Sequence, residues 1–170
     1  MSGHTLTEFI DVVLLPQLRV MVQNGAGYLA FGQIAVGIEF LGACRDAHDF
    51  DQQGHSKCRF ERGITDYMAK VNTGYATYNN SASPYYLYKH LRCGMAHLIR
   101  PHGKVGLIGK GGADAAGLSH LQKHPTYDAV ILVLEDFFAD FEKACQILKS
   151  DIPNLAHRKI TQTFLPVSEA

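Results

Sequence analysis

The sequence predicts a mainly α-helical domain of about five helices in an up-and-down bundle, with a small antiparallel β element before the last helix. Three observations support this fold class. Apolar residues recur at helical spacing in several long stretches, Gly and Pro mark the ends of those stretches, and only one short region is rich in Val, Leu and Ile without that spacing. The 170 residues suit one domain, which we expect at 1–152, followed by an irregular tail at 153–170.

The first predicted helix covers residues 6–24. Starting from Leu6, its apolar side chains fall at i, i+3, i+4, i+7 and i+8, which form one face of a helix. Pro16 lies inside this pattern, and proline lacks the N–H that a helix interior needs. We therefore expect a kink or a break at Pro16.

The second predicted helix, residues 27–46, is apolar on nearly all sides. Glycine recurs in it at every fifth position from Gly27 to Gly42. A glycine inside a helix costs roughly 1 kcal/mol relative to alanine, so this spacing indicates close approach by a neighbouring backbone and a central position in the bundle.

The same helix has to be tested as a membrane span. Residues 28–44 are mostly apolar, but this stretch is short for a span, and Gln33 and Glu39 interrupt it. A buried core helix is the better interpretation. Glu39 would then be a carboxylate in a mostly buried element, and it needs a partner.

The remaining elements follow from local patterns. Residues 47–57 are polar and aperiodic, which predicts a loop, and helical spacing returns over 58–79. Another helix is expected from the Ser81–Pro84 segment to Arg100, and the last one over 133–149. Between them lies a β insert at 104–131, with a hairpin made of 104–108 and 118–123 around a glycine-rich turn, and a third strand at 127–131.

Charge and cysteine usage limit the classes of protein. Sixteen Lys and Arg balance sixteen Asp and Glu, so a nucleic acid would have to bind a local basic patch. The four cysteines, Cys44, Cys58, Cys93 and Cys145, are widely spaced, which is typical of free thiols in a reducing compartment. The N-terminus lacks the layout of a signal peptide. We expect a cytoplasmic protein.

Residues 85–100 carry the densest group of basic and nucleophilic side chains. On a helical wheel, Arg92 and His97 lie roughly 140° apart on the side away from the apolar residues, and the long Arg side chain would have to lean around the helix for the two to converge. Gly94 would open the surface to another chain or a ligand. The apolar face consists of Leu87, Leu91, Met95 and Leu98.

Three interpretations of this group compete. It is a solvated basic face, with Arg92 paired to a carboxylate such as Glu39. Alternatively it is a ribonuclease site, in which His97 moves a proton and Arg92 stabilises the charge on the scissile phosphate. In the third interpretation His90, Cys93 and His97, at i, i+3 and i+7, bind a metal such as zinc.

The segment from Arg92 to His97 matches R-x4-6-H and resembles the motif of the HEPN superfamily (higher eukaryotes and prokaryotes nucleotide-binding). The resemblance covers residues 1–150 and implies an all-α, commonly dimeric bundle. It also implies a metal-independent ribonuclease of toxin–antitoxin or antiphage systems, or a non-catalytic scaffold or nucleotide-binding module. Catalytic members carry Asn, Asp or His after the arginine, where this chain has Cys93. The glycine-rich segment at 104–123 is an elaboration of the family pattern.

We expect Glu39, His90 and Cys93 to support Arg92 and His97, the two catalytic residues that the resemblance implies. The resemblance implies no metal or other cofactor. The expected partners are a second copy of the chain, in a dimer of about 38 kDa from two 18.8 kDa chains, RNA or a nucleotide, and a protein of the antitoxin type.

Three weaker patterns receive a structural interpretation. The glycines at 109–112 lack the full phosphate-loop motif and predict a flexible turn. The loop residues His48, His55 and Cys58 fit no standard metal spacing and are expected to be solvated. His120 and His124 are expected at the surface.

Overall fold

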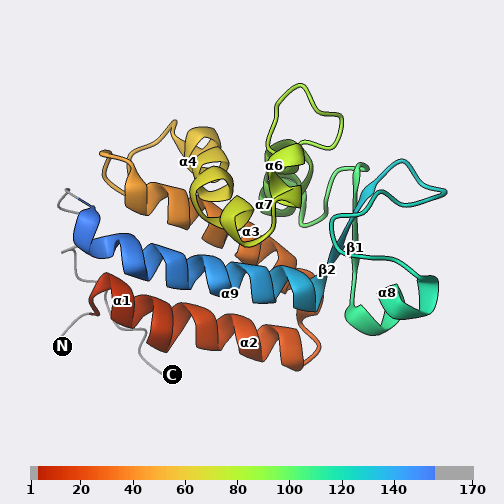
Figure 1. Cartoon of the computed structure of the whole chain (residues 1–170), viewed down its shortest axis with the longest axis horizontal. Helices are drawn as coiled ribbons and strands as arrows, with labels where there is room; N and C mark the ends of the chain where they lie inside the picture. Colours follow the sequence, from red (N-terminus) through yellow and green to blue (C-terminus); the bar gives the residue numbers. More distant parts are fainter. Residues whose placement is uncertain (1–3, 156–170) are drawn as a thin grey trace.

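The computed structural model describes residues 4–155, and helices make up most of this part of the chain (Figure 1). Helix α9 (Leu134–Asp151) runs between the N-terminal helix on one side and α3 (Gly27–Arg45) and α4 (Ser56–Gly63) on the other. A two-stranded sheet and the short helix α8 (Lys110–Ala116) lie at one end. The prediction of a mainly helical fold is confirmed.

The N-terminal helix is continuous through three segments, α1 (Leu6–Glu8), the π-helical η1 (Phe9–Leu14) and α2 (Leu15–Gln23). The chain does not break at Pro16, which is the second residue of α2. Proline lacks an N–H, and its ring crowds the carbonyl one turn earlier. The wider π turn directly before Pro16 accommodates both effects, so the helix continues.

Helices α3 and α4 touch through their backbones. A Cβ atom added at Gly42 of α3 would lie 1.8 Å from the carbonyl oxygen of Arg59, and one added at Gly63 of α4 would lie 2.0 Å from the carbonyl oxygen of Ile38. The predicted close approach by a neighbouring backbone is thus confirmed at Gly42. At Gly32 the space is filled by a side chain instead, that of Met95.

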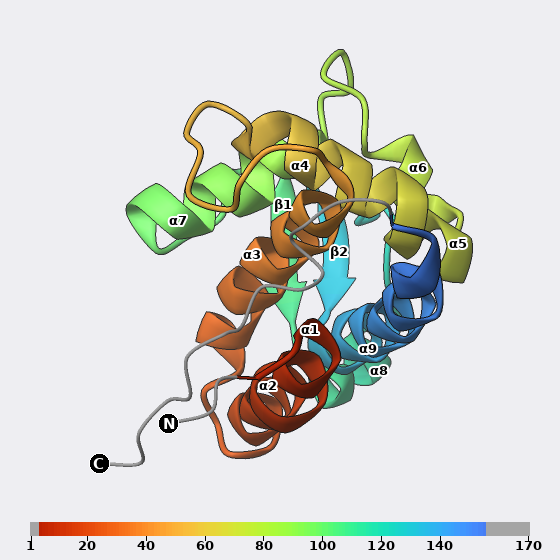
Figure 2. The same ribbon diagram turned by 90° about the vertical axis from the view of Figure 1, so that its left-hand side faces the viewer.

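Helix α3 is also the central helix, as Figure 2 shows. Within residues 4–155 it is the one helix long and apolar enough to cross a membrane, and 56% of its most apolar window is buried inside the molecule. The buried side includes Ile34 and Ile38, which are fully covered, and Phe31, whose ring stacks on that of Phe137 from α9 at 6.1 Å. This is the burial expected of a core helix.

A buried arginine fixes the loop between α3 and α4. Arg59 donates to the Asp46 carboxylate at 2.6 Å and to the carbonyl oxygens of Asp49 and Phe50 at 2.7 and 2.9 Å. The predicted loop is therefore fixed by hydrogen bonds from the buried Arg59 side chain. The predicted helix at 58–79 is found as a series of segments, namely α4, the π-helical η2 (Ile64–Met68), α5 (Ala69–Val71) and α6 (Gly74–Thr77).

The β element differs from the predicted hairpin. Strands β1 (Val105–Ile108) and β2 (Val130–Val133) are parallel, with Val105 opposite Val130 and Ile108 opposite Val133. The prediction of an antiparallel hairpin is wrong because the glycine-rich segment forms α8 rather than a turn. Parallel strands need a long connection of this kind. Of the predicted strand at 118–123, the structure shows only an isolated antiparallel bridge of Lys123 to Val130.

The last helix closes the fold, and its predicted position is confirmed. Its charged face reaches the N-terminal helix through ion pairs of Lys149 with Asp11, at 2.7 Å, and of Glu142 with Arg19. A short 3-10 turn, η4 (Ile152–Asn154), follows α9. Most of the predicted irregular tail lies outside the described residues.

We expect Gly42→Ala to lower the free energy of unfolding by at least about 2 kcal/mol, because the new methyl group meets the backbone of α4 and no flexible side chain can give way. Gly32→Ala is the matched control in the same helix. There the neighbour is the flexible Met95 at 3.3 Å, so alanine's better helix propensity keeps the change within about 1 kcal/mol. Urea unfolding followed by circular dichroism measures both. Equal effects would show that α3 and α4 can separate freely.

Candidate functional site

The Arg92–His97 motif lies on two helical segments, the π-helical η3 (Tyr88–Cys93) and α7 (Gly94–Leu98). The predicted start in the Ser81–Pro84 segment is wrong, because those residues form turns and helical structure begins at Leu87. The apolar face is confirmed for its first three members and wrong for the last. Leu87 and Leu91 are fully buried and Met95 is 7% exposed, whereas Leu98 is 50% exposed at the end of α7.

Arg92 pairs with Glu39, as the sequence analysis predicted. The Arg92 Nε donates to Glu39 Oε2 at 2.6 Å, and both side chains are only 17% exposed. Ser56 of α4 donates its hydroxyl to the same Oε2 at 2.9 Å, and the Tyr88 hydroxyl donates to Ser56 Oγ at 3.3 Å. The pair therefore joins η3 to both α3 and α4, and its charges are compensated inside the domain.

Two tyrosines beside the pair act as hydrogen-bond donors. Burial raises the pKa of Tyr86, and the Glu61 carboxylate that accepts its hydroxyl proton raises this pKa further. Burial also raises the pKa of Tyr88; the nearby Cys93 thiol adds to this effect, while Arg92 opposes it. Both phenols thus keep their protons at neutral pH. Tyr86 orients the Glu61 carboxylate and Tyr88 orients the Ser56 hydroxyl, and neither supplies a base.

His97 is exposed, and within residues 4–155 it makes no hydrogen bond or ion pair. The structure does not bring it into contact with Arg92. Directly after α7 the chain turns through Ile99, which has a positive φ of 54°. The Tyr28 hydroxyl of α3 donates to the Ile99 carbonyl oxygen at 2.8 Å and so holds the end of α7. A fixed helix end therefore presents the imidazole to solvent.

Gly94 has a different role from the one predicted. A Cβ atom there would lie 2.6 Å from the carbonyl oxygen of Arg100 and 2.9 Å from the backbone nitrogen of His102. The backbone that approaches Gly94 is thus that of the same chain, folding back along η3, and the His102 N–H donates to the His90 carbonyl at 2.8 Å. The expectation that Gly94 is open to another chain or a ligand is wrong.

The proposed metal ligands are not gathered by the fold. The ring of His90 meets that of His102, with centroids 6.1 Å apart, while Cys93 lies beside the tyrosines. Burial lowers the pKa of His90, and the nearby Lys89, His102 and Lys104 lower it further. Within the described part of the chain no three His, Cys, Asp or Glu side chains are placed to hold a metal. The spacing argument assumed α-helical turns, and η3 is π-helical.

A second polar network was missed by the sequence analysis. His120, expected at the surface, has a side chain that is only 6% exposed. Its Nδ1 accepts the Val133 N–H at 3.0 Å, so the ring proton lies on Nε2, 2.8 Å from the Tyr75 hydroxyl. Tyr75 in turn donates to Asp140 at 3.2 Å. The network connects α6 to the junction of β2 and α9. No local sequence signal identifies it, because it depends on how these distant segments meet.

Comparison of the chain with protein-family models, with curated proteins and with solved structures found no match. The function therefore has to be argued from the geometry of this molecule.

Glu39→Ala should lower the free energy of unfolding by about 1–3 kcal/mol, because it leaves the half-buried Arg92 guanidinium without its counter-charge. The double variant Glu39→Ala/Arg92→Ala should lose less than the sum of the single variants, because the two changes remove one shared interaction. Urea unfolding of the wild type, the two single variants and the double variant measures the coupling free energy between Glu39 and Arg92. Strict additivity would contradict the pairing.

The stability of the fold should fall when the solution is acidified below about pH 6.5, the ordinary pKa of histidine. Burial lowers the pKa of His120 in the folded protein, against the opposing effect of Asp140 and Asp136. On acidification, His120 therefore binds a proton at a higher pH in the unfolded chain than in the folded protein. His120→Asn keeps an acceptor for the Val133 N–H but does not titrate, so its unfolding free energy should depend less on pH between 5 and 6.5. The exposed His97→Gln is the control and should follow wild type.

Proposed function

We propose that this chain is a HEPN-like, metal-independent endoribonuclease whose site is built on Arg92 and His97. One observation carries the proposal. A rigidly anchored arginine and an exposed histidine lie on one helix, the arginine held by Glu39 through Nε alone. The two terminal nitrogens of the Arg92 guanidinium make no hydrogen bond within residues 4–155, so their N–H donors are left for a phosphate oxygen.

The reaction that fits these groups is transesterification within RNA. The ribose 2′-oxygen attacks the adjacent phosphorus, a proton leaves the 2′-hydroxyl, and the bond from phosphorus to the 5′-oxygen breaks as that oxygen gains a proton. His97 would serve as the base or the acid in this exchange. Arg92 would stabilise the additional negative charge on the phosphorane. The products are a 2′,3′-cyclic phosphate and a 5′-hydroxyl.

The π turn in η3 supports the proposal. π-helical turns are rare, and they occur frequently at functional sites. Here the turn ends at Cys93, directly after Arg92, and His97 follows in an ordinary α-helical segment. The irregular turn thus sets the direction of the arginine separately from that of the histidine.

A homodimer would complete such a site, because one chain does not bring Arg92 and His97 together. An apolar hollow of about 280 Å³ lies between α3 and α7, bordering the site helix. Leu29, Val36 and Ile99 on its walls are 50%, 45% and 63% exposed. Exposed apolar surface of this kind marks interaction sites. A two-fold contact here would set two α7 helices side by side and bring together two copies of His97.

A non-catalytic HEPN-like scaffold or RNA-binding module is the second candidate. The observation that favours it is the position of Arg92, whose charge is already compensated by Glu39. Cys93 also occupies the position that is polar in catalytic members of the superfamily.

The catalytic proposal predicts that His97→Ala cuts cleavage of unstructured RNA by two to four orders of magnitude, the usual contribution of a general acid or base. Arg92→Ala should have an effect of the same size through lost charge stabilisation. Glu39→Ala is the matched control for Arg92, because it breaks the same ion pair and leaves the guanidinium in place. Because the guanidinium then loses its fixed orientation but keeps its charge, the activity should fall by less than it does in Arg92→Ala, when both are assayed well below their melting temperatures.

Gel analysis of end-labelled RNA measures the rates, and the products should carry 2′,3′-cyclic phosphates. DNA should resist, because it lacks the 2′-hydroxyl. A wild-type protein that binds RNA without cutting it would support the scaffold instead. A particle that remains at 18.8 kDa in light scattering would exclude a site shared by two copies.

A further inference from the structure

The charges of this neutral chain are strongly segregated along the sequence. From residue 67 to residue 134 there are seven Lys and Arg but only two acidic residues, Asp114 and Asp128. The uninterrupted part, 67–113, contains no Asp or Glu. It includes the site helix and β1, so the overall charge balance conceals a basic region that contains the proposed site.

The fold brings several cations of this region close to one another. Lys89 and Lys104 both act on the pKa of His90, so the three groups lie near one another. The segment after α7 folds back against η3, since the His102 N–H donates to the His90 carbonyl at 2.8 Å. Lys104 follows two residues later, with a backbone N–H that donates to the His102 carbonyl at 2.6 Å. The cations of η3 therefore continue directly into those beside β1.

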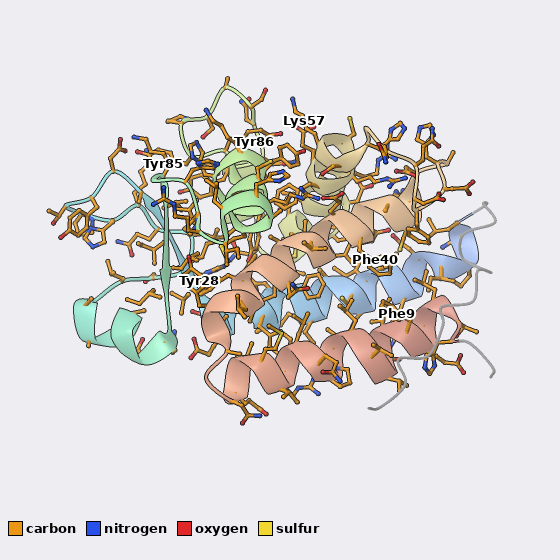
Figure 3. All side chains as sticks on the ribbon, turned by 180° about the vertical axis from the view of Figure 1, so that it is seen from behind. Phe9, Tyr28, Phe40, Lys57, Tyr85 and Tyr86 are labelled. Carbon is orange, nitrogen blue, oxygen red and sulfur yellow. The ribbon has the colours of Figure 1, made fainter. Side chains whose placement is uncertain are left out.

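These contacts then extend to the segment that precedes β2. Lys104 pairs with Asp128, and the Tyr85 hydroxyl donates to the same carboxylate. The ammonium of Lys123 lies over the Tyr85 ring, 4.7 Å from its centroid. Figure 3 shows Tyr85 on the side of the molecule that carries the loops of the β element. Asp128 is the one acidic residue in this set of contacts, and the cations beside it lower its pKa.

An exposed aromatic ring lies at the far end. Tyr127 is 69% exposed, yet the turn that carries it is tightly bonded. The backbone N–H groups of Thr126 and Tyr127 both donate to His124 Nδ1 at 3.0 Å. The His124 ring packs beside that of Tyr127, with centroids 4.6 Å apart. The fold thus holds the large ring of Tyr127 in a fixed position in solvent. This arrangement favours a role for the ring in binding a ligand.

We propose that these residues form a binding track for single-stranded RNA, in which Lys89, Lys104 and Lys123 contact successive phosphates and Tyr127 stacks on an unpaired base. Cations that follow a strand, with an aromatic platform beside them, are the combination by which proteins bind unpaired nucleic acid. A duplex would hide the base faces that Tyr127 needs. The inference rests on the proposed function for RNA as the ligand, and it assigns the strand's path away from the Arg92–His97 site.

The test measures binding separately from cleavage. In a His97→Ala background, fluorescence anisotropy follows a labelled oligouridine of twelve nucleotides between 50 and 300 mM NaCl. The double variant Lys89→Ala/Lys123→Ala should lower the slope of log K against log salt by about 1.4, or roughly 0.7 for each lost phosphate contact. Lys70→Ala/Lys143→Ala, on α5 and α9, is the charge-matched control and should leave the slope unchanged.

The aromatic part of the track has its own variants. Tyr127→Ala should weaken binding by roughly 10- to 100-fold with little change in the salt slope, because stacking is not an electrostatic interaction. Tyr127→Phe keeps the ring and should bind within about twofold of the background protein. The same RNA annealed to its complement should bind more weakly than the free strand. Thermal melting of each variant confirms that these exposed substitutions leave the fold intact.

The outcomes separate the two proposals. RNA binding that depends on the track, without any cleavage by the wild-type protein, supports this inference and overturns the catalytic one. Cleavage by the wild-type protein, with track variants that bind and cut as it does, overturns this inference alone. If the slope of log K against log salt falls equally in Lys70→Ala/Lys143→Ala, the RNA is attracted by positive charge in general and not by this track. That result would overturn the inference. A wild-type chain that binds no RNA at 50 mM NaCl overturns both proposals.

Discussion

The backbone contact of α3 with α4 is the constraint on which the remaining structure depends. With no side chain at Gly42 or Gly63, the two helices approach until the carbonyls of one fill the space beside the glycines of the other. This distance sets Ser56, in the first turn of α4, within 2.9 Å of Glu39 on α3. Helix η3 then packs across both, and Arg92 completes the group. A wider separation would leave the carboxylate without its hydroxyl donor.

The Arg92–Glu39 ion pair has a structural role in joining η3 to α3, and the proposed function adds a chemical role for Arg92. A half-buried Arg–Glu pair is costly to desolvate, and burying it contributes little net stability compared with apolar residues of the same size. In the proposed function, the pair matters because it fixes the orientation of the Arg92 guanidinium. The Nε contact with Glu39 fixes the plane of the Arg92 guanidinium, and a planar group of fixed orientation suits a phosphate better than a mobile one does. His97, by contrast, owes its position to the way Tyr28 holds the end of α7.

The sequence was most informative where a pattern is local. Apolar periodicity located the last helix, and a long apolar stretch with regularly spaced glycines located the central one. The need of a buried carboxylate for a partner identified the contact of Glu39 with Arg92. It was uninformative where distant segments meet. The direction of β2 relative to β1 depends on α8. The glycines of this segment had predicted a turn instead of a helix. The burial of His120 depends on Tyr75 and Asp140, neither of which is near it in sequence. The spacing of apolar residues does not indicate where a helix contains a π turn. The α-helical wheel therefore misplaced the side chains of η3.

The ion pair between Lys149 and Asp11 joins residues 138 positions apart, which has a consequence for the chain while it is being made. The first helix packs on α3, which follows it in the chain, but the part of its apolar face that packs on α9 stays uncovered until α9 has been synthesised. Ribosomes add roughly 5–20 residues per second, so that part of the face stays uncovered for on the order of ten seconds. Such a stripe is the kind of surface that ribosome-associated chaperones hold. The emerging chain is therefore vulnerable to aggregation at its oldest part, and this vulnerability ends only when its final helix docks.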